Sequence, residues 1–460
     1  MSFKKKNQLK NDNERSRGFY RTLLRVALPL SLQSLIASSL SLVDNLMVGK
    51  LGETELAAVG LSTQIFFVFW MILFGFTGGA ITYMAQLWGK RDLVNIRRVT
   101  GIALTVSFGI GVLFFTLGLF FPRFILGIFT DIPRVLELGV PWIRLGSIIF
   151  LTWSIVVPLT ALLRATQQTS IPLKISIVVF CTNTGLGLVL IYGFLGMPKM
   201  GIMGACTATV ISRALELLLY IYVIFIRKNF VAGPIKEFFS WNKDLLRRVI
   251  RNAVPTTINE MMWGLGTAMY SSAIGHMSEI EFAAYQAGYT ILNLFSLFCF
   301  SIGDAMLILV GEKLGAGKLE EGYRMAMRIL KVGVVIGLVA GGLLIGLSQP
   351  VVSLFGFSAE GIKLTHYILY VFAGFLFLKV FNSAVVVGAL RSGGDTRFAM
   401  LCESATIWCI GVPVAFVCAL LLGFPVYLVV LCIQVEELVK FTILWRRLRS
   451  RKWLNDLVDY

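Results

Sequence analysis

The sequence predicts an all-α polytopic membrane protein with twelve transmembrane helices in two six-helix lobes related by a pseudo-twofold axis. Hydrophobic residues make up 57% of the 460 residues, and charged residues only 15%. The stretches 57–88 and 99–121 contain no charged residue, and each exceeds the roughly 18 apolar residues that indicate a spanning helix. The second half of the chain also repeats loop motifs of the first. Together these observations favour a duplicated membrane bundle over a soluble multidomain protein.

Apolar runs separated by polar gaps predict the helices in order. The twelve predicted spans cover residues 24–48, 57–87, 99–121, 138–163, 172–195, 201–226, 250–274, 282–311, 329–348, 364–390, 398–422 and 425–445. These spans divide the chain into an N-terminal tail (1–23), an N-lobe (24–226), a basic connector (227–249), a C-lobe (250–445) and a C-terminal tail (446–460).

The net charge of +17 does not point to nucleic acid, because the basic residues are spread over alternate loops instead of forming one basic domain. The N-terminal tail, the connector and the C-terminal tail are among these basic segments. By the positive-inside rule, this alternation predicts that both termini lie in the cytoplasm. The N-terminal tail is too long and polar for a cleaved signal peptide, so it is expected to stay on the protein.

Motifs of the first half recur in the second half at a nearly constant shift. Residues 47–58 return as residues 273–284 at a shift of 226, and residues 164–169 align with 391–396 at a shift of 227. Apolar composition alone would not align loop glycines and arginines in this way. Each repeat holds an even number of spans, so both repeats enter the membrane in the same orientation. A site is then expected between the halves near the midplane, as in transporters.

Asp44 is the notable ionisable residue of the N-lobe. An ionisable group inside a span costs about 2.5–3.5 kcal/mol on insertion scales. Asp44 lies nineteen residues beyond Arg25, which at about 1.5 Å per residue places it in the outer part of the bilayer. It is either a carboxylate that reaches the external interface or a functional carboxylate in a cavity. Arg213 and Glu216 in the sixth span are expected to pair with each other.

The C-lobe carries more ionisable residues within its spans. Glu260 is expected near mid-depth, Asp304 within the eighth span and Lys379 within the tenth. Glu260 and Lys379 lie too deep to reach the interface, so they are expected to face a wet cavity or each other. The hydroxyl of Thr257 adds an oxygen ligand of the kind that hard cations prefer. Sodium binding near Glu260 is therefore a hypothesis, and no other metal site is predicted.

Pro29 and Pro255 each lie early in the first helix of their lobe. A proline removes a backbone N–H, which frees a carbonyl and can bend the helix. The pair is therefore expected to mark helix bends, with ordinary helix-entry prolines as the alternative.

No motif predicts an enzyme. The sequence contains no phosphate-binding glycine loop and no HExxH motif, and its two histidines lie near predicted external loops. No cofactor is expected. Because no ATP-binding motif occurs, any transport is expected to be driven by an ion gradient.

The motifs together resemble those of the multidrug and toxic compound extrusion (MATE) family. The matching segments are residues 43–44, 48–52, 56–58 and 196–205, Pro255 with Glu260, and residues 389–396. The resemblance covers nearly the whole chain and is closer to the bacterial NorM-like branch. It implies two six-helix lobes that form a V-shaped central cavity, in a bacterial inner (plasma) membrane. It also implies export of organic, often cationic, compounds in exchange for H⁺ or Na⁺.

The resemblance implies roles for four residues. Asp44 matches the acidic residue of the family's first helix, and Glu260 matches the glutamate of the seventh helix in the NorM-like branch. Asn183 stands near the place where the DinF-like branch has an aspartate in helix 5. Lys379 stands in the region where the NorM-like branch often has an aspartate in helix 10. The sodium site is then incomplete, which favours H⁺, and we hypothesise that Lys379 is a tethered counter-ion for Glu260.

The expected mechanism is competition, in which Asp44 or Glu260 binds either the coupling cation or a cationic substrate. The expected partners are the lipid bilayer and small organic cations or amphiphilic drugs, and the protein is expected to be a monomer. Two alternatives stay open. One is a lipid-linked oligosaccharide flippase of the same superfamily, which Lys379 keeps under consideration. The other is a membrane receptor or scaffold that transports nothing.

Overall fold

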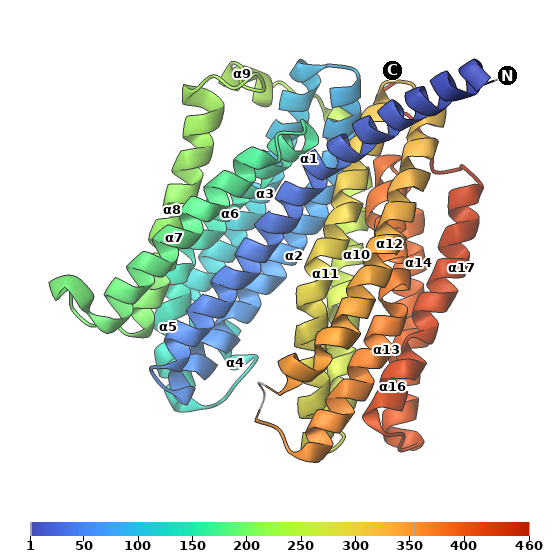
Figure 1. Ribbon diagram of the computed structural model, residues 1–460. Coiled ribbons are helices and arrows are strands. Elements are labelled where there is room, and N and C mark those ends of the chain that lie inside the picture. Colours follow the sequence, from blue (N-terminus) through green and yellow to red (C-terminus); the bar gives the residue numbers. More distant parts are fainter. Residues whose placement is uncertain (1, 354–355, 460) are drawn as a thin grey trace.

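The protein is a bundle of long helices. The computed structural model describes residues 2–353 and 356–459, with the side chains of residues 2–17, 195 and 298 outside that description, and these ranges contain no strand. Both termini lie at the same end of the bundle (Figure 1). We call this end the terminal end and the other the opposite end. The predicted all-α fold is confirmed.

The first six predicted spans correspond to the helices that precede the basic connector. These elements are α1 (Ser2–Gly49), α2 (Glu53–Gly89), α3 (Leu93–Phe120), α4 (Pro122–Gly127), α5 (Pro133–Gly146), α6 (Ile148–Ala165), α7 (Ser170–Tyr192), the 3-10 turn η1 (Phe194–Gly196), α8 (Ile202–Ile221) and the π-helical turn η2 (Tyr222–Ile226). The predicted tail is helical from Ser2 and continues into the first span as α1. The predicted span 138–163 is broken at Ser147 into α5 and α6.

The second half begins with α9 (Ile235–Phe238) in the connector. It continues with α10 (Lys243–Gly275), α11 (Glu279–Gly315), α12 (Leu319–Val352), α13 (Ala359–Ser383) with π-helix η3 (Ala384–Leu390), α14 (Thr396–Thr406) with η4 (Ile407–Gly411), α15 (Val412–Phe416) with η5 (Val417–Leu421), α16 (Val426–Ile433) and α17 (Val435–Arg449). The last predicted span is therefore broken at Gln434.

Polar side chains fix the starts of three spanning helices. Asp92 caps α3 by accepting a hydrogen bond from the backbone N–H of Asn95 (3.0 Å), and Asn242 caps α10 in the same way. Ser278 and Glu281 form a capping box at the start of α11. Such caps satisfy backbone N–H groups that have no partner within the helix.

Ten helices among the described residues are long and apolar enough to cross a membrane. The helix α10 falls outside this set because polar residues such as Asn252 and Glu260 interrupt it, and the α16–α17 pair falls outside it because each helix is short. With these two, the structure fits the predicted twelve helices in two lobes. The V-shaped cavity stays a prediction.

The two lobes contact each other near the terminal end, where the first helix of each lobe packs on the second helix of the other. Thus α1 contacts α11, and α10 contacts α2. A Cβ atom on Gly79 of α2 would lie 2.4 Å from the Cα atom of Ala253 in α10, so only glycine permits this approach. Asn252 donates to the Gly79 carbonyl (2.9 Å), and Thr256 donates to the Gly75 carbonyl (2.7 Å).

Candidate ion and substrate site

Asp44 and Asn183 meet inside the N-lobe. The Asn183 amide of α7 donates to both carboxylate oxygens of Asp44 in α1, at 2.9 and 3.1 Å. Three residues beyond Asp44 in α1, the Met47 carbonyl accepts a hydrogen bond from the Tyr192 hydroxyl of α7 (2.8 Å). This bond also fixes α7 against α1. Asn183 is buried, and its Oδ1 atom has no hydrogen-bond partner among the described residues. The pair therefore offers an unused buried acceptor beside a carboxylate.

Asp44 has no salt-bridge partner among the described residues. The charge of Arg213 in α8 acts on it electrostatically. Arg213 is itself paired with Glu216 at 2.7 Å, as predicted, and its guanidinium lies 4.8 Å from the centroid of the Trp153 ring. The charge of Arg213 is thus largely balanced within α8, and Asp44 is held in place by a neutral amide.

A cavity opens one helical turn from Asp44. It has a volume of about 420 Å³ and is lined by Ser41, Thr63, Gln64 and Phe67 of α1 and α2. Ser41 precedes Asp44 by three residues, which places both on the same face of α1. Asp44 lies five residues before the end of α1, so the cavity and the carboxylate belong to the opposite end of the bundle. A mixed polar and aromatic lining suits an amphiphilic organic molecule.

Glu260 is paired with Arg391 and not with Lys379. The Arg391 Nη2 atom lies 2.5 Å from Glu260 Oε1, and the two side chains are 2% and 14% exposed. The predicted pairing of Lys379 with Glu260 is therefore wrong. Arg391 follows directly after η3 and is buried instead of facing a loop.

Lys379 belongs to a second charged cluster between α13 and α17. There Lys440 lies 2.6 Å from Glu436 and 3.8 Å from Glu437, and all three side chains are mostly buried. The Lys379 ammonium lies 5.3 Å from the centroid of the Phe372 ring, and the charges of Glu437 and Glu436 reach it. The lysine that forms salt bridges with Glu436 and Glu437 is thus Lys440 and not Lys379.

Two further predicted site residues, Thr257 and Asp304, form no hydrogen bond with another predicted site residue among the described residues. The Thr257 hydroxyl donates to the Ala253 carbonyl of its own helix (2.9 Å). Asp304 has no hydrogen-bond partner among the described residues, and the charges of Arg164 and Arg391, one from each lobe, both reach it. Asp304 therefore lies in the field of two arginines at the boundary between the lobes.

The residues around Glu260 do not fit a sodium site. Arg391 already binds the Glu260 carboxylate, and the Thr256 and Thr257 hydroxyls donate to backbone carbonyls. The neighbouring Asn259 amide donates to Glu403 (2.6 Å). Within the described residues, no group of three or more His, Cys, Asp or Glu side chains could hold a metal ion.

Pro29 and Pro255 lie inside α1 and α10, which continue through them. Because Pro29 has no N–H, the Arg25 carbonyl loses its helical partner. This carbonyl accepts a hydrogen bond from the Thr169 hydroxyl at the start of α7 (3.2 Å). The freed group thus joins α1 to α7, and a bend at either proline stays a prediction.

Sequence reasoning missed Arg391 and Glu403 as interior groups. Arg391 appeared only as a landmark of the repeat, and Glu403 lies three residues before the end of α14. The available signal was the repeat itself: Gln33 corresponds to Asn259 at a shift of 226, and Ser176 corresponds to Glu403 at a shift of 227. Gln33 donates to Ser176 (3.3 Å), as Asn259 does to Glu403.

Known proteins match the chain in both lobes. The family model MatE matches residues 29–189 and 255–417. The probable multidrug resistance protein YoeA of Bacillus subtilis strain 168 is 26% identical over 405 residues, which cover 86% of each chain. The probable multidrug resistance protein NorM of Thermotoga maritima is also 26% identical over 405 residues, covering 86% of this chain and 84% of that one.

Solved structures share the fold. A MOP superfamily transporter from Pyrococcus furiosus has a TM-score of 0.84 at 19% identity, covering 94% of this chain and 96% of that one. A multidrug resistance MATE family transporter of the MOP superfamily, solved in an outward-facing conformation, has a TM-score of 0.84 at 18% identity with the same coverage. At these identities the likeness establishes the fold alone.

Proposed function

Because this chain belongs to the MatE family, we propose that it exports organic cations in exchange for protons and that Asp44 is the exchange carboxylate. The observation that carries this proposal is the contrast between Asp44, held only by the Asn183 amide, and Glu260 and Glu436, each bound to a cation. A carboxylate without a fixed counter-ion can bind a proton or an organic cation in turn.

The proposed exchange begins from the arrangement described above, in which the lobes contact each other at the terminal end. A proton that arrives from the opposite end neutralises Asp44. The neutral acid no longer attracts a cation in the neighbouring cavity, so the cation leaves toward that side. The unused Oδ1 atom of Asn183 can accept the hydrogen bond of the acid after the amide rotates. Separation of the lobes at the terminal end would then let Asp44 exchange its proton for a new cation.

The proposed exchange is electroneutral. One proton exchanged for one monovalent cation moves no net charge, so the membrane potential contributes nothing to the cycle. A difference of one pH unit supplies about 1.4 kcal/mol, which sustains roughly a tenfold gradient of the exported cation. Coupling to Na⁺ in place of H⁺ would give the same neutrality, and the paired state of Glu260 is the reason to favour H⁺.

The charges of the C-lobe weigh against the flippase alternative. A pyrophosphate headgroup requires cations that are free to bind it, whereas Arg391 is bound to Glu260 and Lys440 to Glu436. Lys379 forms no salt bridge within the described residues, but it lies against Phe372 and in the field of the acidic Glu437 and Glu436. The receptor or scaffold alternative predicts no ion movement, so a transport assay distinguishes it. A location in a bacterial inner membrane with cytoplasmic termini, and action as a monomer, remain parts of this proposal.

The test uses proteoliposomes with the full chain and tetraphenylphosphonium as the organic cation. An imposed pH gradient should drive uptake by the wild type, and Asp44→Asn should lower the rate at least a hundredfold. The matched control is Glu53→Gln, which removes an exposed carboxylate at the same end and should keep the wild-type rate. Wild-type rates with Asp44→Asn, or a sodium gradient that drives uptake at constant pH, would contradict the proposal.

A further inference from the structure

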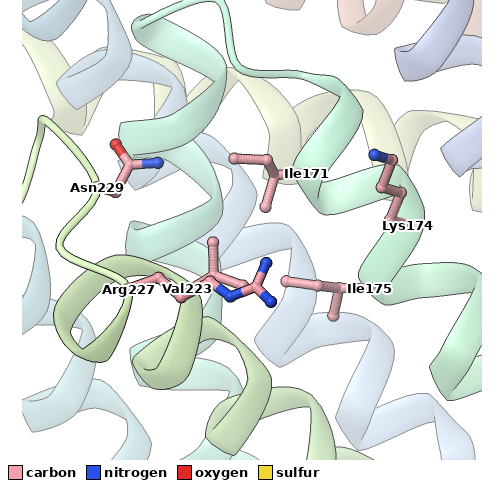
Figure 2. A pocket seen from close by; sticks show the side chains of 6 residues that line it. All are labelled: Ile171, Lys174, Ile175, Val223, Arg227 and Asn229. Carbon is pink, nitrogen blue, oxygen red and sulfur yellow. The ribbon is translucent and has the colours of Figure 1, made fainter.

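A cavity of about 310 Å³ lies between α7 and η2 at the terminal end, away from Asp44. It is lined by Ile171, Lys174, Ile175, Val223, Arg227 and Asn229. In Figure 2 the Arg227 guanidinium extends toward Ile175, and the Ile171 and Val223 side chains point into the same space. One side of the cavity is thus apolar, and two basic residues border it.

Hydrogen bonds join the two chain segments that border this cavity, one before α7 and one after η2. The side chains of Gln168 and Asn229 donate to each other, at 3.2 and 2.6 Å. Asn229 Oδ1 also accepts from the backbone N–H of Val231 (3.2 Å). The turns on both sides contain a non-glycine residue in the left-handed region, Gln167 (φ 61°) and Lys228 (φ 49°). Such conformations persist where surrounding contacts hold them, so the cavity is preformed.

The two basic side chains are available to a ligand. Both Lys174 and Arg227 are exposed, and neither forms a salt bridge within the described residues. The Arg227 Nε atom donates to the Tyr222 hydroxyl (3.3 Å), and the guanidinium lies 5.3 Å from the centroid of that ring. This orients the guanidinium and leaves its terminal nitrogens free to donate. Residues 227–251 contain seven basic and two acidic residues, so the surrounding potential attracts anions.

An apolar surface continues from the cavity along the outside of the bundle. Ile177 and Val178 of α7 are each 45% exposed, and Leu218 of α8 is 62% exposed. In a membrane-embedded protein such side chains contact acyl chains. A basic concavity at the end of an apolar, lipid-facing surface has the polarity of a phospholipid, with the phosphate at the interface and the chains in the hydrocarbon.

We propose that this cavity binds the headgroup of an anionic phospholipid, whose phosphate lies between Lys174 and Arg227. The apolar wall then accommodates the glycerol backbone and the start of the acyl chains. The lipid joins the ends of α7 and α8, and α7 also carries Asn183 nine residues beyond Lys174. This site is separate from the exchange site, because it lies at the other end of α7.

The test measures lipid binding by native mass spectrometry of the full protein, with phosphatidylglycerol or phosphatidylcholine as the probe. The wild type should retain phosphatidylglycerol in preference to phosphatidylcholine. Each of Lys174→Gln and Arg227→Gln should weaken this binding about fivefold, and the double variant roughly thirtyfold. Arg227→Lys keeps the charge and should lose less. Lys243→Gln removes an exposed basic residue of the same segment that lies outside the cavity, and should bind like the wild type.

Three outcomes would overturn the proposal. The first is equal retention of phosphatidylglycerol by the wild type and by the folded double variant. The second is equal loss in Lys243→Gln, which would indicate a general charge effect. The third is competition by inorganic phosphate at concentrations similar to those of the lipid, which would indicate a site for soluble anions. If the double variant does not fold, the single variants and Lys243→Gln decide the matter.

A different observation supports a second inference, about the C-terminal segment 450–459. Trp453 is fully buried in the core of the C-lobe, whereas Val458 is 2% exposed in the core of the N-lobe. Between them, Asn455 donates to the Gly393 carbonyl of the C-lobe (3.1 Å). The segment therefore crosses from one lobe to the other at the terminal end.

Two side chains at the end of α2 hold this segment. The buried Gln86 donates to the Asn455 carbonyl (3.0 Å) and accepts from the backbone N–H of Leu457 (2.7 Å). Lys90 donates to the Val458 carbonyl (2.8 Å) and forms a salt bridge with Asp459 (3.1 Å). We infer that residues 450–459 form a strap that keeps the terminal end closed and must detach from α2 when the lobes separate there. This inference rests on the lobe separation of the proposed function.

The test measures the distance between spin labels at exposed Val94 and Lys318, one on each lobe at the terminal end, by pulsed electron resonance. The background lacks Cys181, Cys409 and Cys432, which are not buried. Lys90→Gln, which removes a charged hydrogen bond, should raise the ratio of separated to closed molecules about tenfold. A chain that ends at Asp456 should do the same, and Lys243→Gln should not. Unchanged distances in Lys90→Gln would overturn the strap. If this variant also transports normally, the proposed function would hold without the strap.

Discussion

Equivalent arginines of the two lobes bind partners of different charge. In the N-lobe, Arg164 donates to the neutral Gln33 (2.7 Å). In the C-lobe the equivalent Arg391 binds the carboxylate of Glu260. The fifth helix of each lobe repeats the contrast, with Ser176 in α7 where α14 has Glu403. The duplicated scaffold therefore carries uncharged partners in one lobe and carboxylates in the other.

The sixth helix of each lobe continues this comparison. Arg213 corresponds to Lys440 at a shift of 227, and each is neutralised by a glutamate of its own helix. The difference lies in the first helix, where Asp44 corresponds to Tyr270. The Tyr270 hydroxyl donates to Glu436, whereas Asp44 accepts from an amide. In the C-lobe, Glu260, Glu436 and Glu437 are thus in ion pairs, whereas Asp44 of the N-lobe lies outside such a pair.

The largest effect is expected when a C-lobe ion pair loses its cation. Arg391→Ala leaves Glu260 buried without a counter-ion, which costs about 3–5 kcal/mol. We expect a large fall in thermal stability, measured by fluorescence-detected size-exclusion chromatography after heating. The double variant Arg391→Met with Glu260→Leu should recover most of the loss. A stable single variant would contradict the assignment of this pair.

A smaller effect is expected at the equivalent position of the N-lobe. Arg164→Ala removes a hydrogen bond between a charged and a neutral group, which contributes about 1.5–3 kcal/mol. Gln33 stays neutral, so no isolated carboxylate is left beside it. The same heating assay should rank this variant between the wild type and Arg391→Ala. The reverse order would refute the difference between the lobes.

The smallest effect is expected at Lys379. Lys379→Met removes a charge that forms no salt bridge within the described residues and lies against Phe372. Because Lys440 already neutralises Glu436, transport of tetraphenylphosphonium should change less than about twofold, since the electrostatic interaction that is lost is small. A complete loss of exchange would restore the counter-ion role for Lys379 that the sequence suggested.

The fold could be predicted from the sequence because hydropathy and the repeat act along the chain. Uncharged runs located the spans, and the repeat fixed their division into lobes. The breaks at Ser147 and Gln434 were missed, since neither residue is a proline or a glycine. The π-helical turns were missed for the same reason: their signature is a hydrogen-bond pattern, not a composition.

The candidate site could be predicted only in part. Asp44 and Asn183 were both candidates, and the structure places them in contact, while their role in transport stays a prediction. Arg391 was missed because a basic residue at the end of a span reads as a topology signal. Whether such a residue faces the interior depends on the tertiary packing around it, which here buries Arg391 and pairs it with Glu260. The wrong partner for Glu260 followed directly, since Lys379 was then the only deep cation considered near it.

The central claim is that Asp44, and no C-lobe carboxylate, exchanges a proton for an organic cation. The most direct test measures protons released when tetraphenylphosphonium binds the purified protein in weakly buffered solution. The wild type should release about one proton per cation when Asp44 is protonated beforehand, and its affinity should fall about tenfold for each unit of pH below the Asp44 pKa. Asp44→Asn should release none, whereas Glu403→Gln, which alters a C-lobe carboxylate that is also held by an asparagine, should behave like the wild type. Proton release that persists in Asp44→Asn and disappears in Glu403→Gln would contradict the account.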